Sequence, residues 1–535
     1  IILASFFERW PAGGKGLAAV LITWRGERNR GARAVSSMTR RVRALHVAEK
    51  PSVAKSLAAT LSKNSARMRR GPSVYNALFE FETAGPRGPK SNWRFEHVVT
   101  SVTGHLMSSE FAEPYNKWQA CSPRELLCED ISQVKWSVPD DKKPLKQQLE
   151  IEARNCDWLI LWLDCDREGE AICYEVLNVC SAVNGRMDVW RAKFSSLNVA
   201  EVEKAWNTLG RPDERKSEAV ACRTELDLRS GAAFTRLQTF RIQGRYAGLQ
   251  EAGGIVSYGP CQFPTLGFIV ARQNEIDAFN ARNFWRIELQ TKSLDAETQQ
   301  PQLVNWNWRR QRLFDRVVAT VLLEECVEAE DAVIEGIDAR PTTKSRPLPL
   351  ATLELQKRAS RWLQLGSQET MEVAESLYQR GYVSYPRTET DKFSAEFDLR
   401  GLLHDHRADN RWGGHVDALL DSPNGSPASF LWPKAGQRDD EAHPPIHPTK
   451  AAGPTELTDA RDKKIYELIA RHFIASCSRD ATGRQTTVTL SMGDEYFETK
   501  GLIVDDRNWL AVYTYERWNA NSLPGFVVQQ RLVPS

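Results

Sequence analysis

The sequence predicts a multidomain protein of mixed class, with an α/β domain followed by helical and β-rich regions. Three observations support this prediction. Strand-like and helix-like segments alternate from about residue 44 to 200, helical periodicity dominates from 201 to about 273, and apolar and polar residues alternate from 283 to about 338. The chain has 535 residues, of which 41% are hydrophobic and 26% are charged, so it can bury several cores.

The first domain, residues 44–200, begins with a buried-strand pattern at 44–48 and a helix pattern at 53–61, for which Ser52 is the expected cap. Further patterns predict a strand at 95–103, a helix near 143–154 and a strand at 158–163. This last strand runs directly into the acidic segment 164–170, and another helix follows it. Acidic residues therefore follow two strands of one predicted domain.

The later regions change character twice. Residues 201–272 predict a helical domain, and the alternating patterns within 273–338 predict a β-rich domain that also takes up residues 462–535. A proline-rich stretch at 340–350 is the expected boundary of the inserted region 339–461. That region is predicted to be helical up to about residue 421 and to contain a mobile loop at 421–445. A helix at 461–477 and strands at 485–490 and 495–504 follow.

Charge and cysteine content exclude several classes of protein. No apolar run approaches the roughly 18–20 residues that cross a bilayer. The net charge is +2, but residues 1–44 carry nine basic and two acidic residues, a net of +7, which leaves −5 for the rest. Any nucleic-acid contact must therefore come from a local groove.

Ten cysteines without a Cys-x-x-Cys motif favour a reducing compartment. Residues 1–43 are expected to form a basic disordered leader or an organelle transit peptide.

The acidic residues at the two strand ends form the first candidate site. Glu49 follows the first strand, and Asp164, Asp166 and Glu168 follow the strand at 158–163. Ligands gather at the carboxyl ends of strands in open α/β sheets, and Mg²⁺ prefers carboxylate oxygens. The alternative is a solvated acidic loop. Lys50 is either a surface charge or, beside a phosphate, a point cation or general acid.

The segment Gly381-Tyr-Val-Ser-Tyr-Pro-Arg-Thr-Glu-Thr390 forms the second candidate site. A tyrosine hydroxyl, with a pKa near 10, is a poor nucleophile until a cation or base assists it. Arg387 lies two residues after Tyr385 and can offer a guanidinium to a phosphate. Taken alone, Tyr382 and Tyr385 also fit the end of an ordinary amphipathic strand.

Two histidines in a proline-rich stretch form the third candidate. His443 and His447 are four residues apart, but the prolines between them exclude a shared helix face, so a helical metal pair is not expected. Either ring can contact a phosphate or serve a structural role. The sequence contains no G-x-x-x-x-G-K-[ST] motif, so an ATP-driven mechanism has no support.

Taken together, these segments resemble the type IA DNA topoisomerases, and in particular their eukaryotic topoisomerase III alpha group. The resemblance runs in family order from about residue 44 to the last residue. It rests on AEKPSVAK (48–55), TSVTGHL (100–106), WLDCDREGEAI (162–172), RAKFSSL (191–197), ELDLRSGAAFTRLQT (225–239), SYGPCQFPTLGFIV (257–270), GYVSYPRTET (381–390) and AHPPIHPTK (442–450). It implies an N-terminal Toprim domain within a toroidal core of helical and β domains.

The resemblance also implies a role for each candidate residue. Tyr385 matches the nucleophile that becomes joined to a 5′ phosphate, Arg387 the arginine that steadies it, and Lys50 the lysine that protonates the leaving 3′ oxygen. The family's magnesium site is matched by Glu49, Asp164, Asp166 and Glu168. Its active-site histidine is matched better by His443 than by His447. The expected lining of a single-stranded DNA groove comprises Arg191, Arg223, Arg229, Arg236 and Gln262.

By the same resemblance the protein is expected to relax negative supercoils and to resolve recombination intermediates without ATP. A RecQ-type helicase and an OB-fold accessory protein are the expected partners, in the nucleus or, through the basic leader, also in mitochondria. The chain departs from the family in two ways. The segment RAKFSSL ends in Ser195-Ser196-Leu197, where the family commonly has an acidic ending. The chain also ends before the family's last segments, so it is expected to be an incomplete gene product. The alternatives are a non-catalytic single-stranded DNA-binding scaffold and another Toprim enzyme such as a primase or nuclease.

Overall fold

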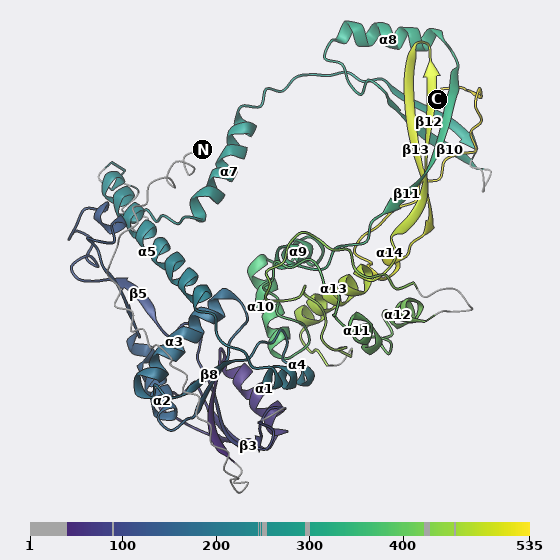
Figure 1. Cartoon of the computed structure of the whole chain (residues 1–535). Coiled ribbons are helices and arrows are strands. Elements are labelled where there is room, and N and C mark those ends of the chain that lie inside the picture. Colours follow the sequence, from purple (N-terminus) through teal and green to yellow (C-terminus); the bar gives the residue numbers. More distant parts are fainter. Residues whose placement is uncertain are drawn as a thin grey trace, which may run out of the picture. The chain divides into compact units, whose positions relative to one another are not determined.

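A computed structural model of the chain describes residues 40–534 except 88–89, 244, 247, 249–253, 295–299, 422–428 and 454–455 (Figure 1). The expected leader lies outside the described residues up to residue 39. Its predicted end at residue 43 is wrong, because β1 (Arg41–Ala48) begins three residues earlier than expected from the apolar pattern. No helix in the described part of the chain is long and apolar enough to span a membrane.

The first domain is built on a mixed sheet with the strand order β2-β3-β4-β1-β7-β8. Strands β4, β1, β7 and β8 are parallel, and β3 and β2 are antiparallel additions at one edge. Ala48 of β1 pairs with Trp162 of β7, so both strands end at the same edge of the sheet. The strands after β1 are β2 (Arg67–Arg69), β3 (Leu78–Ala84), β4 (Arg94–Ser101), β7 (Trp158–Trp162) and β8 (Asp188–Arg191).

Helices cover both faces of this sheet, which explains why β7 is apolar throughout and why β1 is buried from Ala44 to Ala48. One face packs on α1 (Pro51–Ser62) and α4 (Val199–Asn207), and the other on α2 (Lys143–Ala153) and α3 (Arg167–Val183). The expected cap Ser52 is wrong: α1 begins at Pro51, and the Ser52 hydroxyl donates instead to Gln379, 3.0 Å away.

A long helix follows the first domain. This helix, α5 (Glu214–Ile242), packs against a hairpin of β5 (Ser108–Phe111) and β6 (Val134–Ser137), with 3₁₀ turns at Glu125–Leu127 and Asp140–Lys142 nearby. A further helix, α7 (Gln262–Asp277), lies later in the chain and ends beyond the predicted limit at 272. Helices α5 and α7 thus lie in the region predicted to be helical, whereas α4 belongs to the first domain.

The β-rich region forms an antiparallel sheet with the strand order β14-β11-β12-β13-β10-β9. Its strands are β9 (Glu288–Leu294), β10 (Pro301–Trp308), β11 (Ala332–Lys344), β12 (Ala481–Met492), β13 (Glu495–Asp506) and β14 (Arg531–Leu532). Two details differ from the prediction. Helix α8 (Arg316–Glu328), capped by Asp315, lies between β10 and β11. Strand β11 extends into the proline-rich stretch as far as Lys344, which is possible because Pro341 pairs on one side only.

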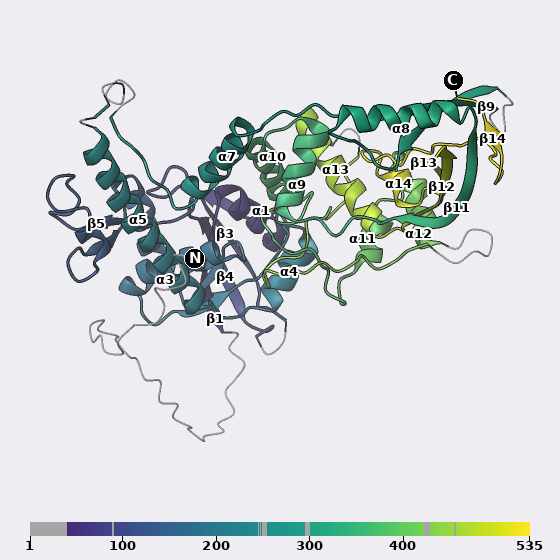
Figure 2. The same ribbon diagram turned by 90° about the horizontal axis from the view of Figure 1, so that it is seen from above.

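The region between β11 and β12 is helical, and its core continues that of the first domain. It contains α9 (Thr352–Arg358), a π-helical turn at Ala359–Leu363, α10 (Ser367–Gln379), α11 (Leu399–Asp405), α12 (Gly413–Leu420) and α13 (Ala460–Ser476). The short helix α14 (Trp509–Val512) follows β13 and contributes to the same core. Helices α10 and α13 lie side by side in Figure 1 and Figure 2. The predicted boundary at 462 is therefore wrong, because α13 packs with the helices.

The predicted mobile loop is only partly described. Residues 422–428 lie outside the described residues, whereas the part from 429 onward is anchored by hydrogen bonds. The Leu431 amide donates to the carbonyl of Cys477, the Gly436 amide donates to the carbonyl of Asp391, and Lys434 pairs with Asp480 at 2.8 Å. The expectation of mobility is therefore wrong for this described part.

Candidate active site

The carboxyl ends of β1 and β7 bring two acidic side chains together, as the parallel register requires. The backbone amide of Asp164 donates to Glu49 Oε2 at 3.2 Å, and the Asp164 side chain is buried. Burial, and then the charge of Glu49, raise the pKa of Asp164 to about 8, against the opposing effect of Lys50. A buried carboxyl thus lies beside a second one at this edge of the sheet, and both burial and the neighbouring charge disfavour its ionised form.

Tyr385 lies against the same edge. Its hydroxyl donates to Asp166 Oδ2 at 2.7 Å, and only 4% of the residue is exposed. Asp166 is also the N-cap of α3, where its other oxygen accepts from the Gly169 amide at 2.8 Å. Burial, together with the charges of Asp164 and Asp166, raises the pKa of Tyr385 far above its ordinary value. The phenol is therefore protonated in the DNA-free protein and already shares its proton with a carboxylate.

The segment that carries Tyr385 is fixed by its backbone. The Tyr385 amide donates to the carbonyl of Ser195 at 3.0 Å, and the Ser384 amide donates to that of His447 at 2.9 Å. Gly381, with φ of +71°, ends α10 in the left-handed region, where a side chain is disfavoured. The turn after α10 therefore sets the direction in which the strand-like segment leaves the helix.

The two histidines occupy different places. The His443 ring packs against the Tyr385 ring with 4.3 Å between centroids, and both of its buried nitrogens are without a hydrogen-bond partner within the described part of the chain. Burial lowers the pKa of His443 to about 4. His447 instead packs among Phe397 and Phe393, and its Nδ1 lies 2.7 Å from the carbonyl of Pro445. The geometry thus places His443 beside Tyr385 and gives His447 a core position.

Two cations lie at the entrance of this site. Lys50 Nζ is 4.0 Å from Glu49 Oε1 and 3.9 Å from Glu375 Oε2. The Arg387 guanidinium, which is more than half exposed, donates through Nε to Glu375 Oε1 at 2.6 Å. Both predicted cations therefore lie near the acidic edge and share one carboxylate that the sequence did not single out.

The donors predicted for magnesium are only partly brought together. Glu49, Asp164 and Asp166 surround the strand ends, but Glu168 is turned away, since it pairs with Arg223 at 2.6 Å and with His105 at 3.0 Å. Among the described residues no group of three or more Asp, Glu, His or Cys side chains could hold a metal ion as they stand. The raised pKa of Asp164 and the all-oxygen donor set nevertheless fit a hard cation held by Glu49, Asp164 and Asp166.

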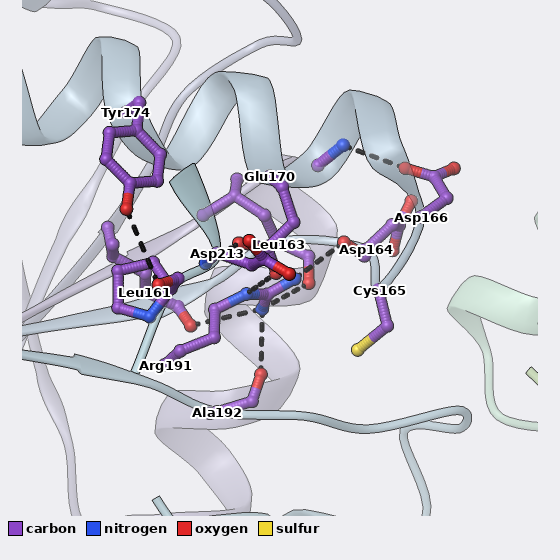
Figure 3. Close-up of polar contacts among 12 residues, drawn as sticks. Leu161, Leu163, Asp164, Cys165, Asp166, Glu170, Tyr174, Arg191, Ala192 and Asp213 are labelled. Atoms are coloured by element: carbon purple, nitrogen blue, oxygen red, sulfur yellow. Dashed lines mark hydrogen bonds and ion pairs between the residues drawn. The ribbon is translucent and has the colours of Figure 1, made fainter. Parts of the chain in front are cut away.

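Arg191 is not available to DNA. The side chain is fully buried, and its guanidinium pairs with Glu170 at 2.9 Å and donates to the carbonyls of Leu163, Ala192 and Asp164 at 2.7–2.8 Å (Figure 3). The expectation that Arg191 contacts DNA is therefore wrong. It ties the loop after β7 to β8, and this holds the backbone of Asp164 in place.

Two further arginines predicted to line the groove are also structural. Arg229 donates to Ser132 and the carbonyl of Leu126, and Arg236 donates to the carbonyls of Lys117 and Tyr115, so both side chains are buried under the hairpin region. Their role as DNA contacts is excluded in this conformation. Arg223 and Gln262 are exposed and stay candidates.

Sequence reasoning missed two residues of the site, both on α10. Tyr378 is fully buried, donates to Asp164 Oδ1 at 3.1 Å, and packs edge-on against Tyr385. Glu375 lies one helical turn earlier and contacts both cations. In the sequence, Tyr378 fits the apolar stripe of an amphipathic helix and Glu375 fits its polar face, so neither pattern indicates the site.

Comparisons with known proteins identify relatives over most of the chain. The DNA topoisomerase family matches residues 211–534, and the Toprim domain family matches residues 44–197. The chain is 43% identical to DNA topoisomerase 3-alpha of Arabidopsis thaliana and 41% identical to that of Homo sapiens, each over 92% of this chain but over 52% and 47% of the relative. The chain thus spans about half the length of these two relatives.

A shorter relative and a solved structure extend the comparison. DNA topoisomerase 3 of Schizosaccharomyces pombe is 37% identical, over 92% of this chain and 76% of the relative. The fold resembles that of full-length topoisomerase I from Thermotoga maritima, with a TM-score of 0.63, 20% identity, and coverage of 92% of this chain and 70% of that one.

Proposed function

The chain belongs to the type IA DNA topoisomerase family, and on this basis we propose that it breaks and rejoins one DNA strand through Tyr385. The observation that carries the proposal is the hydrogen bond of the Tyr385 hydroxyl to Asp166 at the edge where β1 and β7 end. A nucleophile in contact with a proton acceptor, with two cations beside it, is the arrangement that phosphoryl transfer needs.

The proposed step exchanges one phosphoester for another. The oxygen of Tyr385 attacks phosphorus, the bond from phosphorus to the 3′ oxygen breaks, and the phenol proton passes to Asp166. Lys50 is the candidate proton donor to the leaving 3′ oxygen, and Arg387 the candidate contact of the phosphate. Religation is the reverse reaction. Because the new phosphotyrosyl bond retains the energy of the broken one, no nucleotide has to be hydrolysed.

The proposed cofactor is Mg²⁺, held by Glu49, Asp164 and Asp166. When bound there, it supplies positive charge beside the reacting phosphate. The proposal is supported by the contact of the Asp164 amide with Glu49 Oε2 and by the place of Asp166 next to the same strand end, which bring three carboxylates to one edge of the sheet. Glu168 would join these donors only after releasing Arg223 and His105.

We further propose that the whole protein relaxes negative supercoils and resolves recombination intermediates in the nucleus, together with a RecQ-type helicase and an OB-fold accessory protein. These proposals follow from resemblance to the family alone. A mitochondrial pool through the basic N-terminal residues belongs to the same set of proposals.

The decisive experiment is capture of a covalent adduct. A labelled single-stranded oligonucleotide is incubated with the protein and Mg²⁺, and the mixture is denatured and separated on a gel. Tyr385→Phe is expected to abolish the adduct while DNA binding persists, because only the hydroxyl is lost. Tyr382→Phe is the matched control, since its hydroxyl points to Glu456 at 3.3 Å. An adduct formed by Tyr385→Phe would contradict the assignment, and binding without any adduct in the unsubstituted chain would favour the scaffold alternative.

A further inference from the structure

Glu375 stands between the two cations that the proposed reaction needs. Its carboxylate accepts a hydrogen bond from Arg387 Nε at 2.6 Å and also contacts a second nitrogen of the same guanidinium. Its other oxygen lies 3.9 Å from Lys50 Nζ. One carboxylate therefore partly neutralises both Arg387 and Lys50 in the DNA-free protein.

The helix that carries Glu375 cannot easily turn it elsewhere. On α10, the buried residues Ala374, Leu377 and Tyr378 fix the rotation of the helix. Tyr378, three residues after Glu375, donates to Asp164, so the same side of α10 is also held against the acidic edge. Packing thus fixes the backbone of Glu375 beside the two cations, while its partly exposed side chain can still move away from them.

The contact of Glu375 with Arg387 uses N–H groups that a phosphate could also use. Arg387 directs Nε and a second nitrogen at one oxygen of Glu375, Oε1, and a guanidinium can present the same N–H groups to a phosphate oxygen. Burial tends to lower the pKa of Arg387, and the hydrogen bond and charge of Glu375 outweigh this and raise it. The Arg387 side chain is 58% exposed and that of Glu375 is 22% exposed, so an incoming strand can reach the pair.

We propose that Glu375 is a positioning residue that occupies the place of the DNA phosphate and must be displaced when a strand enters. This inference rests on the proposed function of the Tyr385 site. Without DNA, the carboxylate keeps Arg387 and Lys50 directed toward the site. When DNA binds, the phosphate takes over Arg387, and the cost of separating Glu375 from its cations reduces the affinity for the strand.

The test compares two variants that change the net charge equally. Glu375→Gln removes the competing charge, and Glu372→Gln removes a charge from the exposed side of the same helix, where the carboxylate accepts a hydrogen bond from Gln368 at 2.9 Å. Both are made in full chains that also carry Tyr385→Phe, so that no adduct forms. Binding of a fluorescein-labelled oligo-dT is followed by anisotropy at several salt concentrations.

We expect Glu375→Gln to bind at least about threefold more tightly than Glu372→Gln. Its dependence of log K on log salt should be steeper by up to about 0.7, because in Glu372→Gln the displaced carboxylate of Glu375 takes up a salt cation that offsets the ions released by one phosphate contact on a single strand. Equal affinity and equal slope in the two variants would overturn the inference. A misfolded variant would bind more weakly, so tighter binding cannot arise from damage.

A second readout separates positioning from a general structural role. With Tyr385 intact, Glu375→Gln is expected to reach half-maximal adduct formation at a lower DNA concentration than Glu372→Gln, because the phosphate no longer competes with a carboxylate for Arg387. A lower rate at saturation without a gain in affinity would instead identify a structural residue and overturn the inference.

If the unsubstituted chain forms no adduct, the proposed function fails. If it forms one and the two glutamine variants bind alike, only the role of Glu375 fails.

Discussion

Three buried histidines predict that acid destabilises the helical region that carries Tyr385. His406, His447 and His472 are each at most 3% exposed, and burial lowers their pKa values to about 4, about 4 and about 3. An unfolded histidine titrates near 6.5, so between pH 6.5 and 4 the unfolded chain binds protons that the folded chain does not. The contribution of these neutral rings to stability is therefore complete above about pH 6.5 and is lost as the pH falls toward 4.

The size of the effect follows from the shifts. One pKa unit corresponds to about 1.4 kcal/mol, so each ring is expected to cost the folded state about 2 kcal/mol between pH 7 and pH 5. The three rings together cost about 6 kcal/mol, which is comparable with the whole stability of an ordinary domain, about 5–15 kcal/mol. Urea unfolding followed by tryptophan fluorescence should therefore show a midpoint that falls steeply below pH 6.

A double variant isolates the histidines from other acid effects. His447→Gln with His472→Gln removes two titrating rings, so the loss of unfolding free energy between pH 7 and pH 5 should be smaller by about 4 kcal/mol than in the unsubstituted chain. Glutamine packs less well than histidine and lowers the free energy of unfolding at every pH. This effect cancels when the change in that free energy between pH 7 and pH 5 is compared for the two proteins. His404→Gln, at an exposed position of α11, is the control. An equal loss in the double variant and the unsubstituted chain would refute the reasoning.

The remaining predictions concern charges of the site and its supports. Asp164→Asn with Asp166→Asn should remove the stimulation of religation by Mg²⁺, and undiminished stimulation would contradict the assigned donors. Arg191→Met should lower the free energy of unfolding by about 3–5 kcal/mol, measured by urea titration, because Glu170 keeps a buried charge without its partner. Arg223→Gln should reduce the salt slope of single-strand binding by about 0.7, since its guanidinium is exposed and can reach a phosphate.

The sequence predicted the acidic edge well because its geometry depends on a simple rule. Two buried strands, each followed by acidic residues, place those residues together whenever the strands are adjacent and parallel, and β1 and β7 are both. The segment around Tyr385 was identified by its resemblance to a family rather than by its pattern, which also fits an ordinary strand. Its contact with Asp166 depends on packing between distant parts of the chain.

The failures have a common physical cause, since a sequence gives the type of a side chain but not the direction it faces. Arg229 and Arg236 are seven residues apart, on one side of α5, and this side turns toward the carbonyls of the hairpin region rather than to solvent. Helix α8 was overlooked because the alternating strands around it dominated the pattern, although Asp315 caps its first turn. Glu375 sits on the polar side of an amphipathic helix, where its two cations come from segments far away in the sequence.

Because the Tyr385 hydroxyl is bonded to Asp166, chemical modification of Tyr385 can report whether its segment has separated from the acidic edge. A phenol that is 4% exposed and tied to a carboxylate should resist tyrosine-selective acylating reagents, whereas Tyr75, at 80% exposed, and Tyr246, at 64%, should be modified readily. Any motion that separates the segment of Tyr385 from the acidic edge would release its hydroxyl to the reagent. Mass spectrometry of the modified peptides would then follow that separation directly, without an attached dye and without DNA.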